Sequence, residues 1–417
     1  MALQESNFPT TKPELTLDFA NSRCLDPRIT FIRASTGTYV DERGILQTAP
    51  VNVARFDHNP TTGESLGLLV EEPRTNSIRN NTMVGAVAGT PGTIPTNWSD
   101  VPTSNGLNRQ IVGIGTQNGI TYIDIRYSGT ATAAASITIQ PELGSVTVAA
   151  TGQSWTASSW LALVGGSTSG LTVVQRITGR TAAGGFLEFT STSVSLSSTL
   201  TRYVASITMA NALTLRVSSD IDINTKAAGA AIDITLRIGL PQLEQGAFAT
   251  SPILTTTAAA TRSADVASIT GTAFSSWYNQ TEGSFFSQSS VTNPAAYTGR
   301  VYTAGVGTDN ISTFRQSDFQ PVLRTRVSNI DQALFGLGAT WTDSLPRQLG
   351  QAYRVNDFAG ALNGGSVSVD TSGSLPNISV LSIGNQDSAS FFNGHIRRLT
   401  YWRQRLPNST LQTLTSS

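Results

Sequence analysis

Short runs of alternating apolar and polar residues recur along this chain. Alternation places every second side chain on one face and is typical of a half-buried β-strand. Six such runs lie at residues 123–127, 137–139, 145–148, 186–189, 213–217 and 232–238. Turn-forming Gly, Ser, Thr and Asn separate them. The pattern predicts one all-β domain over residues 77–255, of β-sandwich or jelly-roll type.

A second group of strand-like runs fills residues 281–417. Its last long run lies at residues 395–403, and Pro407-Asn408 then begins a short helix that contains Leu411 and Leu414. We therefore expect a second β-sandwich here. Between the two predicted domains, residues 256–280 are a connector that starts in a low-complexity Thr/Ala stretch.

The first 76 residues differ from both predicted domains. Residues 1–14 are polar, with Pro9 and Pro13, and are expected to form an extended arm, either disordered or ordered by a neighbouring subunit. Residues 15–76 are short apolar runs between turns such as Asp41-Glu42-Arg43-Gly44. Such a block is too turn-rich to hold a large core alone. The expected fold is all-β: a hairpin-rich docking block followed by two β-sandwich, jelly-roll or lectin-like domains.

Composition removes several classes of function. The chain has 27 basic and 27 acidic residues, so we expect no electrostatic capture of nucleic acid. A single cysteine, Cys24, excludes an intrachain disulfide and allows folding in a cytoplasm. We expect neither membrane insertion nor a signal peptide, because no long apolar run is present. Two histidines, His58 and His395, are too few for a typical His-based metal site.

Carboxylates offer few candidate sites. Asp220 and Asp222 alternate with isoleucines and would face the same way, so a structural Ca²⁺ site is conceivable. A solvent-facing strand surface is the simpler interpretation. Asp57-His58-Asn59 could hold a metal, but an Asx-type turn before Pro60 explains it more simply. Asp41-Glu42 and Glu71-Glu72 are adjacent in sequence, so neither pair fits a glycosidase acid/base pair. We predict no catalytic, cofactor or metal residues.

The six tryptophans are the first candidates for stacking on a sugar. Trp98 and Trp341 lie in loop-like settings and are the candidate glycan-binding residues. Trp155 and Trp160 flank a probable strand. Trp277 lies in the predicted connector and Trp402 in the last predicted strand. For each tryptophan, the alternative is packing in a core or between domains.

Three groups of motifs resemble known proteins. The first group, at residues 17–19, 33–36, 44–47, 55–57, 67–72 and 74–76, is similar in order and spacing to a block near the N-terminus of many tailed-bacteriophage virion proteins. The second, residues 239–246 with Ser251-Pro252 and then 261–265, resembles the closing strand of carbohydrate-binding jelly-roll modules in such proteins. The third, residues 392–399 with Tyr401-Trp402, resembles the end of concanavalin A-like or laminin G-like lectin sandwiches.

These resemblances imply a phage virion surface protein of tail-fibre or head-fibre type, folded in the host cytoplasm. It would be an adhesin without enzymatic activity that binds host-surface glycans through weak, multivalent contacts. By analogy with phage fibres, we expect a homotrimer. The block at residues 15–76 would bind other virion proteins or join the subunits.

Two other functions are compatible with the sequence. A capsid decoration, collar or tail-adaptor protein would use the same sandwiches to bind only other virion proteins. A tailspike that degrades polysaccharide would need paired carboxylates in a groove, usually on a long repetitive β-helix. The sequence contains no such repeat.

Overall fold

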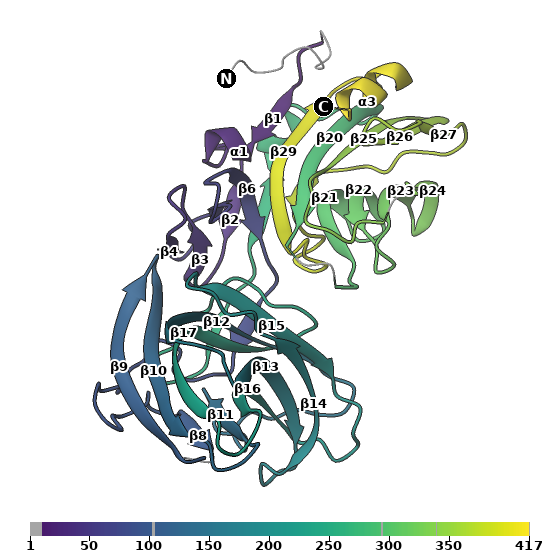
Figure 1. Cartoon of the computed structure of the whole chain (residues 1–417). Helices are drawn as coiled ribbons and strands as arrows, with labels where there is room; N and C mark the ends of the chain where they lie inside the picture. The colour runs from purple at the N-terminus through teal and green to yellow at the C-terminus, as the bar shows by residue number, and fades with distance from the viewer. Residues whose placement is uncertain (1–10, 102–104, 293–294, 339, 417) are drawn as a thin grey trace. The chain divides into compact units, whose positions relative to one another are not determined.

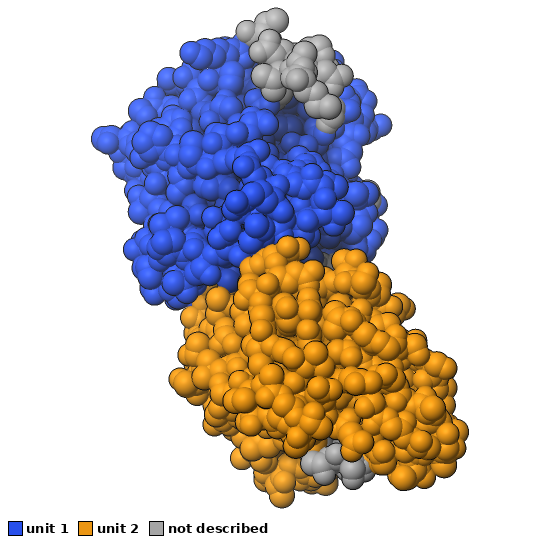
Figure 2. Space-filling model, turned by 60° about the vertical axis from the view of Figure 1, so that its left-hand side comes forward, with its two compact units in different colours: residues 1–73, 263–417 blue, residues 74–262 orange. Residues whose placement is uncertain are grey.

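The computed structural model describes residues 11–101, 105–292, 295–338 and 340–416. Strands form nearly all of its regular structure, which confirms the all-β prediction (Figure 1). Two compact units are coloured separately in Figure 2: unit 1 contains residues 1–73 and 263–417, and unit 2 contains residues 74–262. Most of the predicted N-terminal arm, residues 1–10, lies outside the described residues. Within the described ranges, no helix is both long and apolar enough to span a membrane.

Unit 1 contains two large antiparallel sheets. The first runs in the order β27 (Ser368–Asp370), β26 (Asp357–Leu362), β25 (Arg347–Arg354), β20 (Glu282–Val291), β29 (Gly394–Trp402), β6 (Ser65–Val70) and β5 (Phe56–His58), and β1 (Leu15–Asp18) also pairs with β29. The second runs in the order β2 (Thr30–Ile32), β19 (Val266–Thr270), β28 (Val380–Ile383), β21 (Gly299–Val306), β22 (Asp309–Arg315), β23 (Pro321–Val327) and β24 (Ile330–Gly336). A small hairpin joins β3 (Gly37–Val40) to β4 (Leu46–Ala49).

The N-terminal block is therefore part of this sandwich. Its strands β1 and β6 pair with β29, whereas β2 pairs with β19, which belongs to the predicted connector. The turn predicted at residues 41–44 is present, and Gly44 adopts a φ of 74° there. The block buries its apolar residues against strands from the other end of the chain, which explains how so short a segment is ordered.

The core of unit 1 lies between its two sheets. Phe285 of the first sheet packs against Tyr302 of the second at 4.6 Å and against Tyr401 at 4.7 Å between ring centroids. The predicted C-terminal helix is present as α3 (Asn408–Leu414), and it packs Leu411 and Leu414 against the other face of the first sheet. Two shorter helices, α1 (Phe19–Ser22) and α2 (Gly271–Ser275), bury Phe19 and Phe274.

Unit 2 is a second sandwich of two five-stranded sheets. One runs in the order β15 (Thr201–Thr208), β12 (Ser154–Gly166), β17 (Ala231–Gln245), β10 (Ile120–Thr130) and β9 (Leu107–Gln117). The other runs in the order β14 (Phe186–Ser193), β13 (Leu171–Arg180), β16 (Arg216–Thr225), β11 (Ser136–Gln140) and β8 (Ser99–Val101). The first and last strands of the unit, β7 (Arg74–Asn76) and β18 (Ala260–Arg262), pair with each other.

Two of the six strand predictions in unit 2 need correction. Residues 145–148 form a turn and one isolated bridge, between Val148 and Arg216, and β16 begins only at Arg216 rather than at residue 213. Outside the strands the apolar side chains of these runs are exposed, since Val148 is 67% exposed and Leu213 is 66% exposed, whereas Val217 of β16 is buried. Alternation alone cannot distinguish such loops from strands that bury one face.

Candidate functional site

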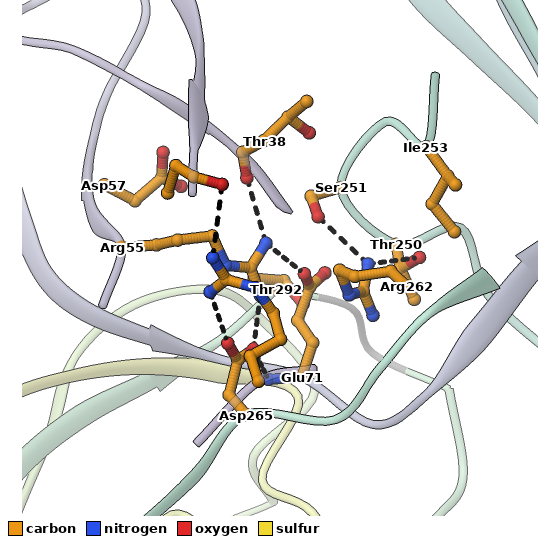
Figure 3. A network of polar contacts seen from close by, with 12 residues as sticks. Thr38, Arg55, Asp57, Glu71, Thr250, Ser251, Ile253, Arg262, Asp265 and Thr292 are labelled. Carbon is orange, nitrogen blue, oxygen red and sulfur yellow. Dashed lines mark hydrogen bonds and ion pairs between the residues drawn. The ribbon is translucent and has the colours of Figure 1, made fainter. Parts of the chain in front are cut away.

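The motifs that resemble phage proteins meet in a buried charge cluster in unit 1, formed by Arg33, Arg55, Glu71 and Asp265. Arg55 pairs with both Glu71, at 2.8 Å, and Asp265 (Figure 3). Arg33 donates to the other oxygen of Asp265 at 3.0 Å. The side chains of all four residues are at most 2% exposed. The opposite charges raise the pKa of Arg55 in spite of its burial.

This cluster connects three segments of unit 1. Arg55 also donates to the Thr38 carbonyl at 2.9 Å. The Glu71 amide donates to Asp265 Oδ2, and the Asp265 amide donates to the Glu71 carbonyl, each at 3.0 Å. The guanidiniums therefore connect the N-terminal hairpin, the end of β6 and the segment before β19. A buried ion pair of this kind specifies one arrangement and is costly to break.

The C-terminal motif binds the same block. The Glu72 amide donates to Asn393 Oδ1 at 2.9 Å, and His395 Nε2 lies 2.8 Å from Asp57 Oδ2. Asp57 also accepts a bond from the Val40 amide at 2.6 Å. Among the described residues no His, Cys, Asp and Glu side chains group as metal ligands. Asn59 caps the following turn through the amides of residues 61 and 62, as the turn interpretation predicts.

Both candidate glycan-binding tryptophans are buried. Trp98 is 6% exposed and its indole N–H donates to the Asn80 carbonyl at 2.7 Å. Trp341 is fully buried and lies 5.6 Å from the Phe392 ring. Neither ring presents a face to solvent, so the structure corrects their interpretation as exposed platforms. The sequence around each tryptophan predicts a loop, but it does not show whether that loop packs its side chains against a core.

One face of the second sheet of unit 2 carries a continuous set of polar side chains. Ile137, Ile139, Ile221 and Ile223 belong to the core, so the alternate residues of β11 and β16 face away from it. With their neighbours on β13 they form what we call the polar face: Thr138, Gln140, Arg176, Asp220 and Asp222. Asp220 and Asp222 thus share a face, as alternation predicts.

These two carboxylates are occupied by protein donors. Arg176 bonds Asp222 at 2.7 Å and Asp220 at 3.3 Å, while Arg180 reaches Asp220 at 3.0 Å. Gln140 and Thr138 donate to the remaining oxygens at 2.9 and 2.7 Å. Burial raises the pKa of Asp222, although Arg176 and Thr138 oppose the effect. The pair is therefore covered by guanidiniums rather than facing solvent, and its geometry favours neither Ca²⁺ nor acid/base chemistry.

Two phenylalanines complete the polar face. Phe186 and Phe189 lie on β14, which forms an edge of the sheet, and each is 54% exposed. No other aromatic side chain of the described residues is as exposed. Their ring centroids are 5.5 Å apart, and the Arg176 guanidinium lies 6.0 Å from the Phe189 ring. We call this pair the aromatic platform.

A β-bulge puts both rings on one face. Strict alternation would place residues three apart on opposite faces. Here Phe189 pairs with Thr178 and Phe186 with Arg180, so the register skips Leu187. Bulges commonly redirect a side chain in this way. The sequence contained both phenylalanines, but only the observed register shows that they act together.

The arrangement suits binding of a flat, partly apolar ligand with hydroxyl groups. Exposed rings offer an apolar surface, and the neighbouring Arg, Asn and Ser side chains offer hydrogen bonds along the strands. Ser136 and Asn224, which pair across β11 and β16 and are half-buried, extend this surface.

No protein-family model matches the chain, and no curated protein matches its sequence. Among solved structures, the chain is similar to the IT-sialidase CBM40 of Ruminococcus gnavus bound to α2,3-sialyllactose, with 12% identity, 34% of this chain and 86% of that chain covered, and a TM-score of 0.31. It is also similar to domains LG4-5 of the mouse laminin α1 chain, with 11% identity, coverage of 72% and 94%, and a TM-score of 0.25.

A third similar structure is the sialidase of Trypanosoma rangeli in complex with the inhibitor DANA. It shares 10% identity, with 75% of this chain and 62% of that chain covered and a TM-score of 0.29. Identities and TM-scores this low do not transfer the ligands of those proteins to this chain. What the chain binds has to be argued from its own residues.

Proposed function

We propose that this protein is a phage virion component that binds glycans of the host surface without enzymatic activity. One observation carries the binding function: a bulge brings Phe186 and Phe189, both half-exposed, onto the polar face of unit 2. Aromatic rings pack against the C–H faces of sugars, and neighbouring charged groups fix orientation through hydrogen bonds. The assignment to a phage particle rests on the motif resemblance in residues 17–76.

The absence of enzymatic activity is part of the proposal. Asp220 and Asp222 are held by Arg176 and Arg180, so neither is available as a general acid or base. Asp57, which contacts His395, is mostly buried and accepts a bond from the Val40 amide. Incubating the purified protein with host polysaccharide should release no oligosaccharides. Detection of such products would contradict this part of the proposal.

The binding proposal is tested with a glycan panel from host surfaces and the full-length protein. Phe186→Ala and Phe189→Ala together should weaken binding of any captured glycan about tenfold, since an aromatic contact contributes roughly 0.5–1.5 kcal/mol beyond its buried area. Both rings are exposed, so the melting temperature should not change.

Val369→Ala is the matched control. Val369 is a large apolar residue, 56% exposed, on β27 of unit 1, and its truncation should leave glycan affinity unchanged. Equal losses in the control and the phenylalanine variants would indicate non-specific adhesion. A panel with no binder at all would leave the decoration function as the better account of the sandwiches.

A second surface supports docking onto other virion proteins. Ile32, Val51 and Val53 of the N-terminal block are 53%, 50% and 47% exposed. Asn52 ties them together, because its amide donates to the Arg33 carbonyl and its side chain accepts from the Arg33 amide. We propose that this apolar surface contacts a virion protein or a second copy of the chain, with a homotrimer as the expected assembly.

Surface substitutions test this docking better than deletion. Deleting the block would remove β1, β2, β5 and β6 from their sheets and so unfold unit 1. Val51→Ser with Val53→Ser should keep the fold but reduce incorporation into particles, measured by protein content of purified virions. Native mass spectrometry of the same variant shows whether trimerisation depends on this surface. Normal incorporation and an unchanged assembly would exclude it as the docking site.

A further inference from the structure

Two arginines on the outer face of the seven-stranded sheet of unit 1 have no acidic partner. Ile311 and Leu323 belong to the core, so Ser312 and Arg324 beside them face away from it. Ser312 pairs with Arg324 across β22 and β23, and Arg300 of β21 pairs with Phe314 of β22. Arg300 and Arg324, which we call the arginine pair, therefore occupy the same face on either side of β22.

Both guanidiniums are buried and only weakly satisfied. Each residue is 7% exposed. Arg300 Nη1 donates to Ser312 Oγ at 3.1 Å, and Arg324 Nη2 donates to Asn310 Oδ1 at 3.2 Å. Both guanidiniums lie over the Phe314 ring, at 3.9 and 5.2 Å from its centroid. Neither forms an ion pair with a carboxylate of the described residues, and both Nε atoms are buried without a partner.

The surrounding charges add to the imbalance. The negative charge of Asp331 acts on both guanidiniums, but Asp331 is already bonded to Arg326 at 2.6 Å. Burial lowers the pKa of Arg300 to about 9, and the positive charges of Arg324 and Arg326 act in the same direction. Burial and Arg326 lower the pKa of Arg324 to about 10. The face therefore holds two positive charges more than its neighbours neutralise.

Stacking on Phe314 compensates for this only in part. A cation over an aromatic ring is stabilised, but a buried charge without a counter-ion remains costly. Perturbed ionisable groups with a missing partner are typical of binding sites. The remaining terminal nitrogens, Arg300 Nη2 and Arg324 Nη1, form no hydrogen bond with the described residues. Unlike the two Nε atoms, they are not fully buried, so they are accessible to a ligand.

We propose that the arginine pair binds an oxyanion, the carboxylate or sulfate group of an acidic ligand. Two planar guanidiniums match the geometry of such a group and would form charge-assisted bonds with it. Ser312 and Asn310 hold the two forks in place, and Phe314 forms the apolar floor. The pair lies in unit 1 and the aromatic platform in unit 2, so either proposal can fail alone.

Calorimetric titration of the full-length protein tests the proposal. The probes are sodium sulfate, glucuronate and, as the neutral counterpart of glucuronate, glucose, all at constant ionic strength set with chloride. Sulfate, glucuronate or both should bind, and glucose should not. Sulfate alone would assign a tetrahedral group and glucuronate alone a carboxylate. Arg300→Met and Arg324→Met, which keep an apolar side chain of similar length, should each weaken binding at least tenfold.

Arg354→Met is the matched control. Arg354 is an exposed guanidinium in the other sheet, paired with Asp357 at 2.8 Å, and its loss should leave anion affinity unchanged. Equal binding of sulfate by the wild type and both arginine-pair variants would overturn the proposal. So would binding of none of the charged probes.

Stability of the ligand-free protein gives an independent measurement. Removing a buried, unpaired charge should raise the melting temperature of Arg300→Met in chloride buffer, and sulfate should no longer raise it beyond the general effect of that salt. A purely structural role for the pair, in packing against Phe314, predicts the reverse. Loss of folding in Arg300→Met and Arg324→Met would therefore also count against a binding site.

Discussion

Asp265 accepts bonds from two buried guanidiniums, Arg33 and Arg55, and from the Glu71 amide. Its partners lie 232 and 210 residues away in sequence. Each belongs to a motif that is visible in the sequence, but nothing in one chain shows which arginine meets which acid. The motif residues could be identified from the sequence, whereas their common role needed the fold.

We expect Asp265→Asn to destabilise unit 1 by about 3–5 kcal/mol, because it leaves two buried guanidiniums short of negative charge. Chemical denaturation of the full-length protein measures the change. Asp343→Asn removes a partly exposed partner of Arg347 and should cost less than about 1 kcal/mol. Similar small effects for both substitutions would show that the charge cluster does not hold the N-terminal block in place.

Asp41 gives a pH-dependent prediction at the same scale. Burial alone would raise the pKa of Asp41, but hydrogen bonds from Arg43, the Ile45 amide and Gln47 together hold it well below its usual range. A lowered pKa means that the carboxylate stabilises the fold above the pKa of the unfolded chain, about 4, and that this stabilisation is lost as pH falls further.

Asp41→Asn should therefore cost about 1 kcal/mol at pH 7. The difference from the wild type should shrink progressively below about pH 4. Urea denaturation at several pH values measures it. Glu42→Gln, which affects the exposed pair with Arg23, is the control and should show little effect at any pH. A difference between Asp41→Asn and the wild type that is independent of pH would contradict this role.

At the scale of elements, alternation predicted the positions of strands more reliably than it predicted which face of a sheet each side chain lies on. The runs at residues 123–127, 137–139, 186–189 and 232–238 all lie within strands of unit 2. The aromatic platform could not be predicted, because the bulge at Leu187 depends on pairing between β13 and β14. The tryptophans proposed as glycan contacts are buried, and the exposed aromatic rings are those of Phe186 and Phe189.

Deleting Leu187 should test the bulge directly. Without the extra residue, β14 would pair continuously with β13, and Phe186 and Phe189, then only two residues apart, would keep a common face without a bulge. Because β14 is an edge strand, the protein should stay folded, and glycan affinity should stay close to that of the wild type rather than fall as in Phe186→Ala. Circular dichroism and the glycan titration separate the two effects. Lost affinity in a folded deletion variant would show that a common face is not sufficient and that binding needs the geometry of the bulge itself.

At the scale of the whole molecule, unit 2 is an insertion into unit 1. Unit 1 consists of residues 1–73 and 263–417, so its two parts flank unit 2 in sequence. The ends of the insertion are adjacent, because Arg74 pairs with Arg262 across β7 and β18. The sequence predicted two sandwiches, but periodicity carries no information on which distant segments share a sheet.

Because unit 2 is inserted into unit 1, we expect a fragment to fold only when it contains a whole unit, cut at the boundaries near residues 74 and 262. Replacing residues 74–262 with about four Gly and Ser residues should give a folded unit 1, because the Asp265 amide bonds the Glu71 carbonyl at 3.0 Å and so brings the cut ends together. Residues 263–417 alone should not fold, since β29 would lose β1 and β6, and the core would lose Leu17, Leu68 and Val70.

Thermal unfolding and size-exclusion chromatography of the two fragments measure the difference. Adding residues 11–73 as a separate peptide to residues 263–417 should restore a cooperative transition, because the peptide supplies the missing strands and the two arginines of the charge cluster. A cooperative, monomeric fold of residues 263–417 without that peptide would mean that the N-terminal block is an accessory to the sandwich. Its exposed surface at Ile32, Val51 and Val53 would then be better explained as part of a detachable docking arm.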